Sequence, residues 1–424
     1  QIDVLRAFKR VVRERGATAV YVSHDLAVVA QMADQIVVLN GGQIFEQSAT
    51  APLLKGPAHE YTRSLLAAAR PDTTIRPPCG VVEDVPLLTI KGLTAGYGNK
   101  NAQGMPAIRV LEDIDLTVRR GQAIGVIGES GSGKSTLARV VAGLLTPALG
   151  GLTFDGQPLG GSLSERTDDQ FRRIQMVFQN ADTALNPMHS ISTILSRPLK
   201  MYFGLKGAAL RERIGEMLDL VRLPRTLAER RPNELSGGQK QRVNLARALA
   251  AKPDLILCDE VTSALDTVVG AAILELLRDL RQQLGVSYLF ISHDISTVRA
   301  LCDDVVVMYS GRKIEAGSRQ SFIQAPFHPY TDLLIHSVPE LRQGWLENCG
   351  ATSCELPPIG PKANVAELCT FLNRCPVRVD GLCNRTAPNR RIIDGGSEIL
   401  CHHDSAELLK TQQNLITMTQ GAYA

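Results

Sequence analysis

Residues 123–145, AIGVIGESGSGKSTLARVVAGLL, join an apolar run, a glycine-rich turn and a helix-forming stretch. Within them Gly128, Gly133, Lys134 and Ser135 fit the pattern G-x-x-x-x-G-K-S/T, in which backbone N–H groups surround a phosphate chain. The lysine neutralises the β- and γ-phosphates, the serine hydroxyl binds Mg²⁺, and the positive end of the helix faces the anion. The stretch therefore predicts a site for a nucleoside triphosphate and Mg²⁺, with further candidate ligands at Ser130, Gly131 and Thr136.

A second apolar run, PDLILCDE at 253–260, ends in Asp259 and Glu260. Such a strand places two carboxylates at the carboxyl edge of a parallel sheet, beside the phosphate loop. We expect Asp259 to hold Mg²⁺ through water and Glu260 to polarise the attacking water as a general base. An isolated acidic pair is also typical of a protein surface, but this pair follows a phosphate loop in order and spacing.

The segment NELSGGQKQRVNLARALA, residues 233–250, lies just upstream of the acidic strand, and its LSGGQ resembles the signature of ATP-binding cassette (ABC) proteins. The family's order is kept by GESGSGKST, a glutamine in MVFQN, LSGGQ, LILCDE, SALD and ISHD. The resemblance covers residues 86–340 in full and 1–75 in part. It implies an α/β fold of the P-loop NTPase class, with a RecA-like core, a helical subdomain and an antiparallel β subdomain.

The resemblance also implies roles for the remaining motif residues. In the family, the signature faces the γ-phosphate bound by the opposite subunit, so that ATP joins two cassettes. Gln179 is expected to touch Mg²⁺ and the attacking water, and His293 to hydrogen-bond the γ-phosphate. A strand-end histidine that only caps its turn is the plainer alternative for His293. The candidate residues of the signature and of SALD are Ser236, Gly237, Gly238, Gln239 and Asp266.

Two positions are less regular. Tyr97, in LTAGYGNK, is a candidate for stacking on adenine, with simple packing of a loop tyrosine as the alternative. Val261 stands where the family has proline after the catalytic glutamate, and a proline would fix φ and stiffen that turn. The valine in place of proline therefore bears on how the turn positions Glu260.

The chain contains an internal repeat. VYVSHD at 20–25 matches LFISHD at 289–294, and GPAHEYTRSLL matches APFHPYTDLLI without a gap, 269 residues apart. We therefore expect a C-terminal remnant of a first cassette at 1–75, with VYVSHD as a buried strand, a linker at 76–85, a complete cassette at 86–340 and an extension at 341–424. On this view the natural protein is a longer tandem fusion. His24 is idle, and the remnant is marginal unless it packs on the complete cassette.

Six of the nine cysteines fall between Cys349 and Cys401. FHPYTDLL, NADTALNP and the cysteine-containing tail resemble importers of the oligopeptide/dipeptide type, a group that includes nickel and glutathione uptake systems. In some members the tail binds a [4Fe-4S] cluster, with Zn²⁺ or free thiols as alternatives here. The matching cysteines are Cys369, Cys375, Cys383 and Cys401, whereas Cys349 and Cys354 stay unassigned, and His402 and His403 are surface residues or extra ligands.

Composition limits the partners. The 424 residues carry a net charge of +3 without a basic patch, which argues against nucleic acid. The apolar runs are strand-sized, and no stretch resembles a signal peptide, so a cytosolic compartment is expected. The resemblance implies an ATPase at the cytoplasmic face of the inner membrane, with two permease subunits, a solute-binding protein and a second cassette as partners. The alternatives are a non-catalytic nucleotide-binding remnant and a cassette ATPase unconnected with transport.

Overall fold

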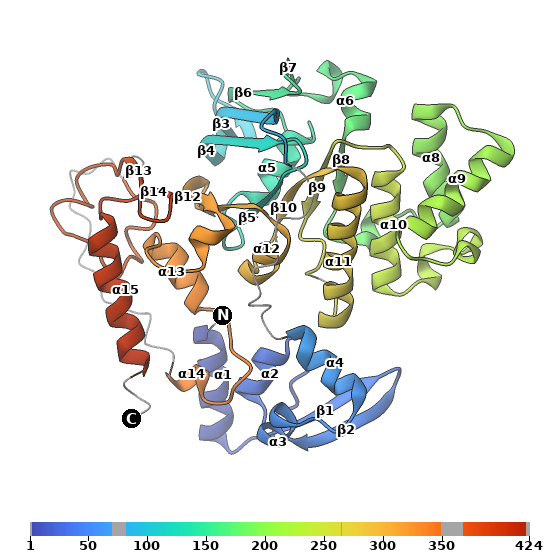
Figure 1. Cartoon of the computed structure of the whole chain (residues 1–424). Coiled ribbons are helices and arrows are strands. Elements are labelled where there is room, and N and C mark those ends of the chain that lie inside the picture. Colours follow the sequence, from blue (N-terminus) through green and yellow to red (C-terminus); the bar gives the residue numbers. More distant parts are fainter. Residues whose placement is uncertain (1, 70–81, 264, 349–367, 421–424) are drawn as a thin grey trace.

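The structure is a computed structural model that describes residues 2–69, 82–263, 265–348 and 368–420. Its centre is an eight-stranded sheet (Figure 1). In spatial order the strands are β13 (Arg390–Ile392), β14 (Glu398–Leu400), β12 (Arg312–Ser318), β11 (Asp304–Tyr309), β5 (Ala123–Ile127), β10 (Ser287–Ile291), β9 (Leu255–Asp259) and β8 (Ile174–Val177).

The five strands from β11 to β8 run parallel. Every residue of β5, β9 and β10 is buried, which is the pattern of parallel strands covered on both faces. Because parallel strands end at one edge, the segments that follow β5, β8, β9 and β10 meet there. The strand and helix expected around the phosphate loop and the acidic pair are therefore confirmed.

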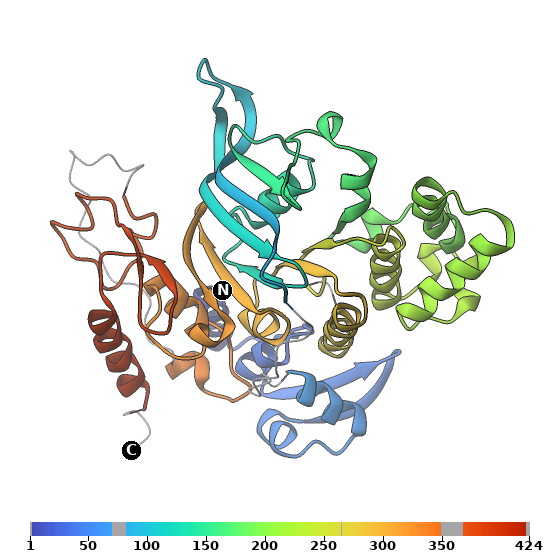
Figure 2. The same ribbon diagram turned by 45° about the horizontal axis from the view of Figure 1, so that its top comes forward.

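Helices cover the faces of this sheet (Figure 2). The longest begins after Asp266, whose carboxylate accepts the N–H of Val269 at 3.0 Å, and ends at Gly285, which adopts a left-handed φ of 66°. Its apolar residues recur at helical spacing and are buried. The helices next to the sheet are α5 (Lys134–Val141), α6 (Asp168–Arg173), α11 (Thr267–Leu284), α12 (Ile295–Leu301) and α13 (Pro329–His336), with 3-10 turns η1 (Leu163–Glu165) and η4 (Arg319–Phe322).

A smaller antiparallel sheet packs over α5. Its order is β4-β3-β6-β7, and its buried side chains share one core with β5 and α5. The sequence alternates buried and exposed residues along its second long strand, as expected for a sheet with one solvated face. The strands are β3 (Pro86–Lys100), β4 (Pro106–Arg119), β6 (Leu149–Phe154) and β7 (Gln157–Pro158).

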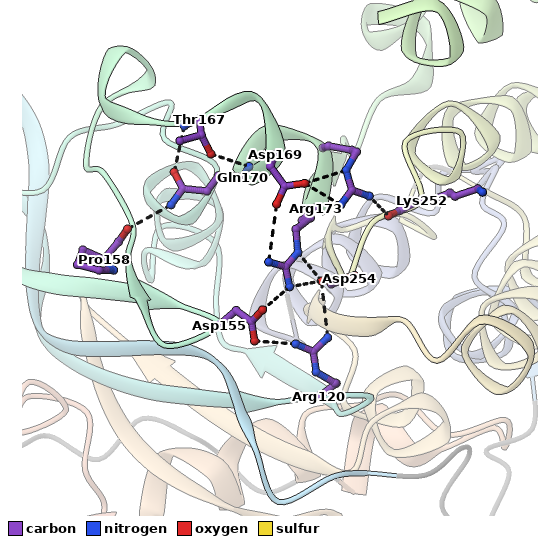
Figure 3. A network of polar contacts seen from close by, with 10 residues as sticks. Arg120, Asp155, Pro158, Thr167, Asp169, Gln170, Arg173, Lys252 and Asp254 are labelled. Atoms are coloured by element: carbon purple, nitrogen blue, oxygen red, sulfur yellow. Dashed lines mark hydrogen bonds and ion pairs between the residues drawn. The ribbon is translucent and has the colours of Figure 1, made fainter. Parts of the chain in front are cut away.

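A network of charged side chains ties the small sheet to the central one (Figure 3). The Arg173 guanidinium, at the end of α6, contacts Asp155 after β6 at 2.6 Å and Asp254 before β9 at 2.5 Å. Arg120, after β4, contacts Asp155 at 2.7 Å. Arg173 holds the pKa of Asp155 below its ordinary value. Exposed pairs contribute about 1 kcal/mol or less each, so the network mainly fixes the orientation of the two sheets.

A helical subdomain lies at the β8 end of the molecule (Figure 1). Apolar residues at helical spacing, such as Leu195, Leu199, Leu210, Ile214 and Leu218, are buried and continue the main core. The elements are α7 (Ala181–Ala184), α8 (Ile191–Phe203), α9 (Gly207–Leu220), η2 (Arg225–Glu229), η3 (Pro232–Glu234) and α10 (Gly237–Leu249). The three parts implied by the family resemblance are thus all present.

The N-terminal segment repeats later elements at the 269-residue spacing. β1 and β2 correspond in this way to β11 and β12, and each hairpin has its register shift at the same step, Val38/Leu39 and Val307/Met308. α2 corresponds to α12. The elements are α1 (Ile2–Arg15), α2 (Leu26–Met32), β1 (Gln35–Asn40), β2 (Gln43–Ala49), α3 (Thr50–Lys55) and α4 (Glu60–Ala69).

The strand expected in VYVSHD is wrong. Residues 17–23 form no strand, and the side chains of Val20 and Val22 are each 90% exposed. The corresponding β10 is buried because it lies between β5 and β9. Among the described residues of the N-terminal segment, β1 pairs only with β2, so nothing supplies the ladder that makes an apolar run a strand.

The N-terminal segment packs on the rest of the chain. Ile2, Leu5 and Val28 share a buried cluster with Trp345 and Leu346, which belong to α14 (Trp345–Asn348). Both views show α4 beside α11 (Figures 1 and 2).

Gln31 completes the contact with α14. It is buried, its amide group donates to the backbone oxygens of Glu340 at 2.7 Å and Arg342 at 2.5 Å, and its amide oxygen accepts the N–H of Leu346 at 3.1 Å. We expected the N-terminal segment to be stable only if it packs on the rest of the chain, and the structure shows that packing.

The C-terminal extension joins the central sheet. β14 pairs with β12, and β13 pairs with β14, so the extension adds two strands to the cassette. Phe371 is fully buried in the main core. The last described helix is α15 (Ser405–Gln420). Cys349, Cys354 and residues 76–81 of the expected linker lie outside the described residues.

Candidate nucleotide site

The phosphate loop lies between β5 and α5, and two glycines allow its path. Gly128 has φ 151°, and a Cβ there would lie 2.2 Å from the backbone oxygen of Met308. Gly133 caps α5 with φ 101°, and a Cβ there would meet the Leu111 side chain at 2.7 Å. Both positions therefore need glycine for conformation and for space.

Lys134 spans this loop. Its ammonium donates to the backbone oxygens of Gly128 at 2.7 Å and Glu129 at 2.8 Å, and the side chain is buried. Burial lowers the pKa of Lys134, while the nearby carboxylates of Glu260, Asp259 and Glu129 oppose that shift. The ammonium therefore lies against the glycine-rich loop that the sequence predicts to bind phosphates.

Ser135 and Asp259 are brought together. The Ser135 hydroxyl donates to Asp259 Oδ1 at 2.8 Å, so the two oxygens expected to serve Mg²⁺ are neighbours. Burial raises the pKa of Asp259, and the hydrogen bond from Ser135 opposes that shift. A divalent cation would offset the burial of this carboxylate.

Glu260, Gln179 and His293 form a second group at the same edge. The Gln179 amide donates to Glu260 Oε2 at 2.8 Å and to the Ser263 hydroxyl at 3.2 Å. His293 Nδ1 lies 3.7 Å from Glu260 Oε2. Pairing with His293 lowers the pKa of Glu260, and pairing with Glu260 raises the pKa of His293. The charged forms of the two side chains therefore support each other.

Glu260 has an unusual backbone. Its φ is 48°, in the left-handed region that non-glycine residues seldom adopt. Two hydrogen bonds hold this turn in place of the family's proline. The Glu260 N–H donates to the Ile291 backbone oxygen at 3.0 Å, and the Ser263 hydroxyl donates to the Glu260 backbone oxygen at 2.9 Å. The buried Val261 side chain anchors the next residue in the core.

The signature residues lie at the start of α10. Ser236 is the N-cap: its hydroxyl accepts the Gln239 N–H at 3.3 Å, and Gln239 Oε1 accepts the Ser236 N–H at 3.0 Å. The hydrogen bonds described for Ser236 thus lie within its own helix start rather than at the phosphate loop. Gly238 packs against α11, where a Cβ would meet Val269 at 2.4 Å. Gly237 is the first residue of α10.

The remaining candidates lie in β3, on the phosphate loop and at the start of α11. Tyr97 lies in strand β3 rather than in a loop, and its hydroxyl is 3.3 Å from the Thr136 hydroxyl. Asp266 caps α11, and the Thr267 hydroxyl next to it donates to the backbone oxygen of His24 at 3.0 Å. The His24 side chain is exposed. Ser130 is exposed on the phosphate loop, and Gly131 has a left-handed φ of 83° there.

The four cysteines of the extension line one small cavity, of about 20 Å³. Burial raises the pKa of Cys375 to about 12 and that of Cys401 to about 11. Within the part of the chain that the structure describes, no three His, Cys, Asp or Glu side chains are close enough together to bind a metal ion. His402 and His403 also line the cavity, and their Nε2 atoms lie 3.1 Å and 2.7 Å from backbone oxygens.

Sequence reasoning missed three residues at the nucleotide site. Ser263 supports Gln179, whereas Tyr330 and Arg374 contact Glu129 of the phosphate loop from distant parts of the chain. The available signals were that Ser263 begins the SALD motif and that Tyr330 and Arg374 lie within two of the stretches that resemble peptide importers.

This arrangement defines a P-loop ATPase site: a glycine loop that begins a helix, a lysine over the loop, a serine–aspartate pair and a glutamate with its glutamine and histidine. None of the described helices combines the length and the apolar character that crossing a bilayer requires.

Comparison with known proteins identifies the family. The family described as "ABC transporter" matches residues 111–263, and "Oligopeptide/dipeptide transporter, C-terminal region" matches residues 314–383. A Brucella abortus protein, provisionally named a peptide import ATP-binding protein, is 39% identical over 306 residues, which cover 72% of this chain and 90% of the relative. A Brucella ovis protein with the same provisional name is 36% identical over 323 residues, covering 76% and 99%.

The structure of cbiO1 from Clostridium perfringens, part of the ABC transporter complex cbiONQ, has a TM-score of 0.50 and 29% identity to this chain. The match covers 56% of this chain and 90% of the cbiO1 chain. The chain belongs to the ABC transporter family, with the oligopeptide/dipeptide type of C-terminal region, and is an ABC ATPase.

Proposed function

We propose that this chain is the ATP-hydrolysing subunit of an importer for oligopeptides, dipeptides or a related small solute. The observation that carries the proposal is the meeting of the Ser135–Asp259 pair and the Glu260 group at one edge of the sheet. The peptide-import names of the relatives and the matching C-terminal region support the transport assignment.

The site residues suit hydrolysis of ATP. The loop N–H groups and Lys134 would bind the phosphates, and Ser135, Asp259 and Gln179 would hold Mg²⁺, which supplies positive charge to the phosphate oxygens when bound. Glu260 would take a proton from the attacking water, and His293 would donate to the γ-phosphate. Gln179 donates to one carboxylate oxygen of Glu260, Oε2, at 2.8 Å, and a carboxylate has further acceptor positions for the attacking water.

A complete ATP site would need a second cassette. The start of α10, with Ser236, Gly237 and Gly238, offers backbone N–H groups to the γ-phosphate bound by a partner. Asp266 and Gln239 would line the same interface, and Tyr97 would support the adenine. We further propose two permease subunits and a solute-binding protein as partners, and a peripheral position on the cytoplasmic face of the inner membrane.

An ATPase assay at increasing protein concentration tests this proposal. If two copies pair through their complete cassettes, specific activity rises with concentration, and the variant Glu260→Gln abolishes it. Activity that is independent of concentration and persists in Glu260→Gln would contradict the proposal.

A non-catalytic nucleotide-binding role is the second candidate. Residues 1–75 contain the counterpart of the ISHD motif but neither a phosphate loop nor an LSGGQ motif, so residues 1–75 and 86–340 do not by themselves form a composite ATP site. This candidate predicts ATP binding without turnover at every protein concentration.

We also propose that the cysteine cavity binds a [4Fe-4S] cluster. Four thiols that line one cavity are the appropriate donor set, and Cys369, Cys375, Cys383 and Cys401 would be the ligands. Because burial raises the pKa of Cys375 and Cys401, binding would displace protons, and it would draw the sulfur atoms closer together. Zn²⁺ is the competing metal.

Anaerobic purification with iron and zinc analysis and an absorbance spectrum distinguishes the two metals. Iron with broad visible absorption that Cys375→Ser removes supports the cluster. Stoichiometric zinc without that absorption would replace the proposal by a zinc site. If the protein contains neither iron nor zinc, the four cysteines are free thiols and the proposal is wrong.

A further inference from the structure

Glu129 of the phosphate loop is held from three sides. Its backbone N–H donates to the Tyr330 hydroxyl at 2.8 Å. Its backbone oxygen accepts from Lys134 at 2.8 Å. Its carboxylate receives two hydrogen bonds from the Arg374 guanidinium, at 2.8 and 2.9 Å. Two of these three groups lie more than 200 residues further along the chain, in the region that follows the cassette motifs.

An aromatic cluster positions both distant groups. The rings of Tyr309, Tyr330 and Phe371 contact one another, with centroid distances from 4.6 to 5.4 Å. Tyr330 and Phe371 are fully buried. The Arg374 guanidinium lies 5.8 Å from the Tyr309 ring centre and 5.9 Å from that of Phe371. Arg374 is thus supported on rings rather than extended freely into solvent.

The charge of the Glu129 carboxylate makes these contacts important for the binding of ATP. Glu129 places a carboxylate in a loop whose ligand is a polyanion, and an unpaired negative charge there would repel the phosphates. The two-bond pairing with Arg374 neutralises that carboxylate and fixes its direction. The Tyr330 hydroxyl accepts the Glu129 N–H and thereby fixes the adjoining peptide group of the loop.

We propose that Arg374 and Tyr330 are positioning residues of the phosphate loop, and that the C-terminal extension sets the affinity of the cassette for ATP through Arg374. The proposal rests on the ATP site proposed above. It assigns to the extension an effect on nucleotide binding that needs no contact between the extension and the nucleotide.

A double-mutant comparison tests the proposal on the full chain, with a fluorescent ATP analogue and Mg²⁺ as the probe. Arg374→Ala leaves Glu129 unneutralised and is expected to weaken binding about three- to tenfold. In the Glu129→Gln background the same change is expected to alter affinity by less than about twofold, because no charge remains to be neutralised. Arg374→Lys should give an intermediate affinity, and Tyr330→Phe should weaken binding without depending on the Glu129 background.

Arg385→Ala is the matched control, since Arg385 is an exposed arginine of the same extension. Its affinity should equal that of the unchanged protein. The proposal is wrong if Arg374→Ala binds the ATP analogue as tightly as the unchanged protein does. It is also wrong if Arg374→Ala lowers the affinity by the same factor with Glu129 and with Glu129→Gln. If Arg374→Ala does not fold, Arg374→Lys in the two backgrounds gives the same comparison. Failure of the unchanged protein to bind the probe would instead refute the ATP site itself.

Discussion

The hydroxyl of Ser135 donates to the carboxylate of Asp259 across 124 residues of sequence, at 2.8 Å. The first residue begins a helix and the second ends a strand, so only the parallel sheet brings them together. The fold itself therefore brings together the two oxygens that are proposed to bind Mg²⁺.

Removing the charge of Asp259 tests this proposed Mg²⁺ site. Asp259→Asn keeps the shape and loses the anion, so binding of ATP with Mg²⁺ should weaken about tenfold or more, whereas binding without Mg²⁺ should change little. Titration of the nucleotide at several Mg²⁺ concentrations measures the difference. Asp84→Asn, at a carboxylate with 97% side-chain exposure, is the control. An unaltered Mg²⁺ dependence in Asp259→Asn would exclude the assigned role.

The Glu260 group predicts a separation of binding from turnover. Glu260→Gln should lower ATP turnover by about 100-fold or more with nucleotide binding retained, because the general base is lost. His293→Ala should also abolish turnover, because His293 Nδ1 lies 3.7 Å from Glu260 Oε2. His24→Ala should leave turnover unchanged, because the His24 side chain is exposed and the described hydrogen bond to Thr267 is made by its backbone oxygen. Equal effects of the two histidine variants would show that the assignment of His293 is wrong.

Glu315 predicts a pH-dependent stability. It is fully buried beside the backbone N–H of His328, and burial raises its pKa from 4.5 to about 7. Between these values the folded protein keeps a proton that the unfolded chain loses. The contribution of this group to the free energy of unfolding is therefore fully present below pH 4.5 and lost as pH rises to about 7.

Glu315→Gln should remove this loss. Denaturant unfolding of both proteins at pH 5.5 and 8 should show the unchanged protein losing on the order of 2 kcal/mol relative to the variant. Parallel pH profiles would mean that Glu315 titrates in the folded protein as it does in the unfolded chain.

Gln31 predicts the strength of the N-terminal docking. Gln31→Ala leaves two backbone oxygens and one N–H without their partner, which costs about 1–3 kcal/mol for a buried group. Hydrogen exchange in α1 and α2 should accelerate, with ATP binding unaffected. Gln47→Ala, on the exposed side of β2, is the control and should exchange as the unchanged protein does.

The sequence predicted the cassette well because its site residues lie in short strand–loop–helix units. Gly128 to Ser135 follow one strand, and Asp259 and Glu260 end another, so periodicity and motif spacing place them without knowledge of distant contacts. The strand at Val20 was mispredicted for the opposite reason. An apolar run becomes a strand only beside partner strands, and β10 has two whereas residues 17–23 have none among the described residues.

The contacts of Glu129 could not have been predicted from periodicity. Tyr330 and Arg374 reach it across 201 and 245 residues, each through a single side chain with no repeating pattern. The Arg374 contact depends on where the extension packs, and the extension continues the central sheet. That continuation rests on two three-residue strands, β13 and β14, which are too short to stand out in the sequence.

The hairpin of β1 and β2 has a consequence for handling the protein. Val37, Leu39 and Ile44 are 44%, 61% and 62% exposed, whereas the matching Val306 and Met308 of β11 are buried in the central sheet. In the described structure the hairpin also pairs with no third strand, so its backbone edges remain open to hydrogen bonding. Open edges beside exposed apolar side chains favour self-association. Aggregation of this chain at high concentration would therefore begin at β1 and β2.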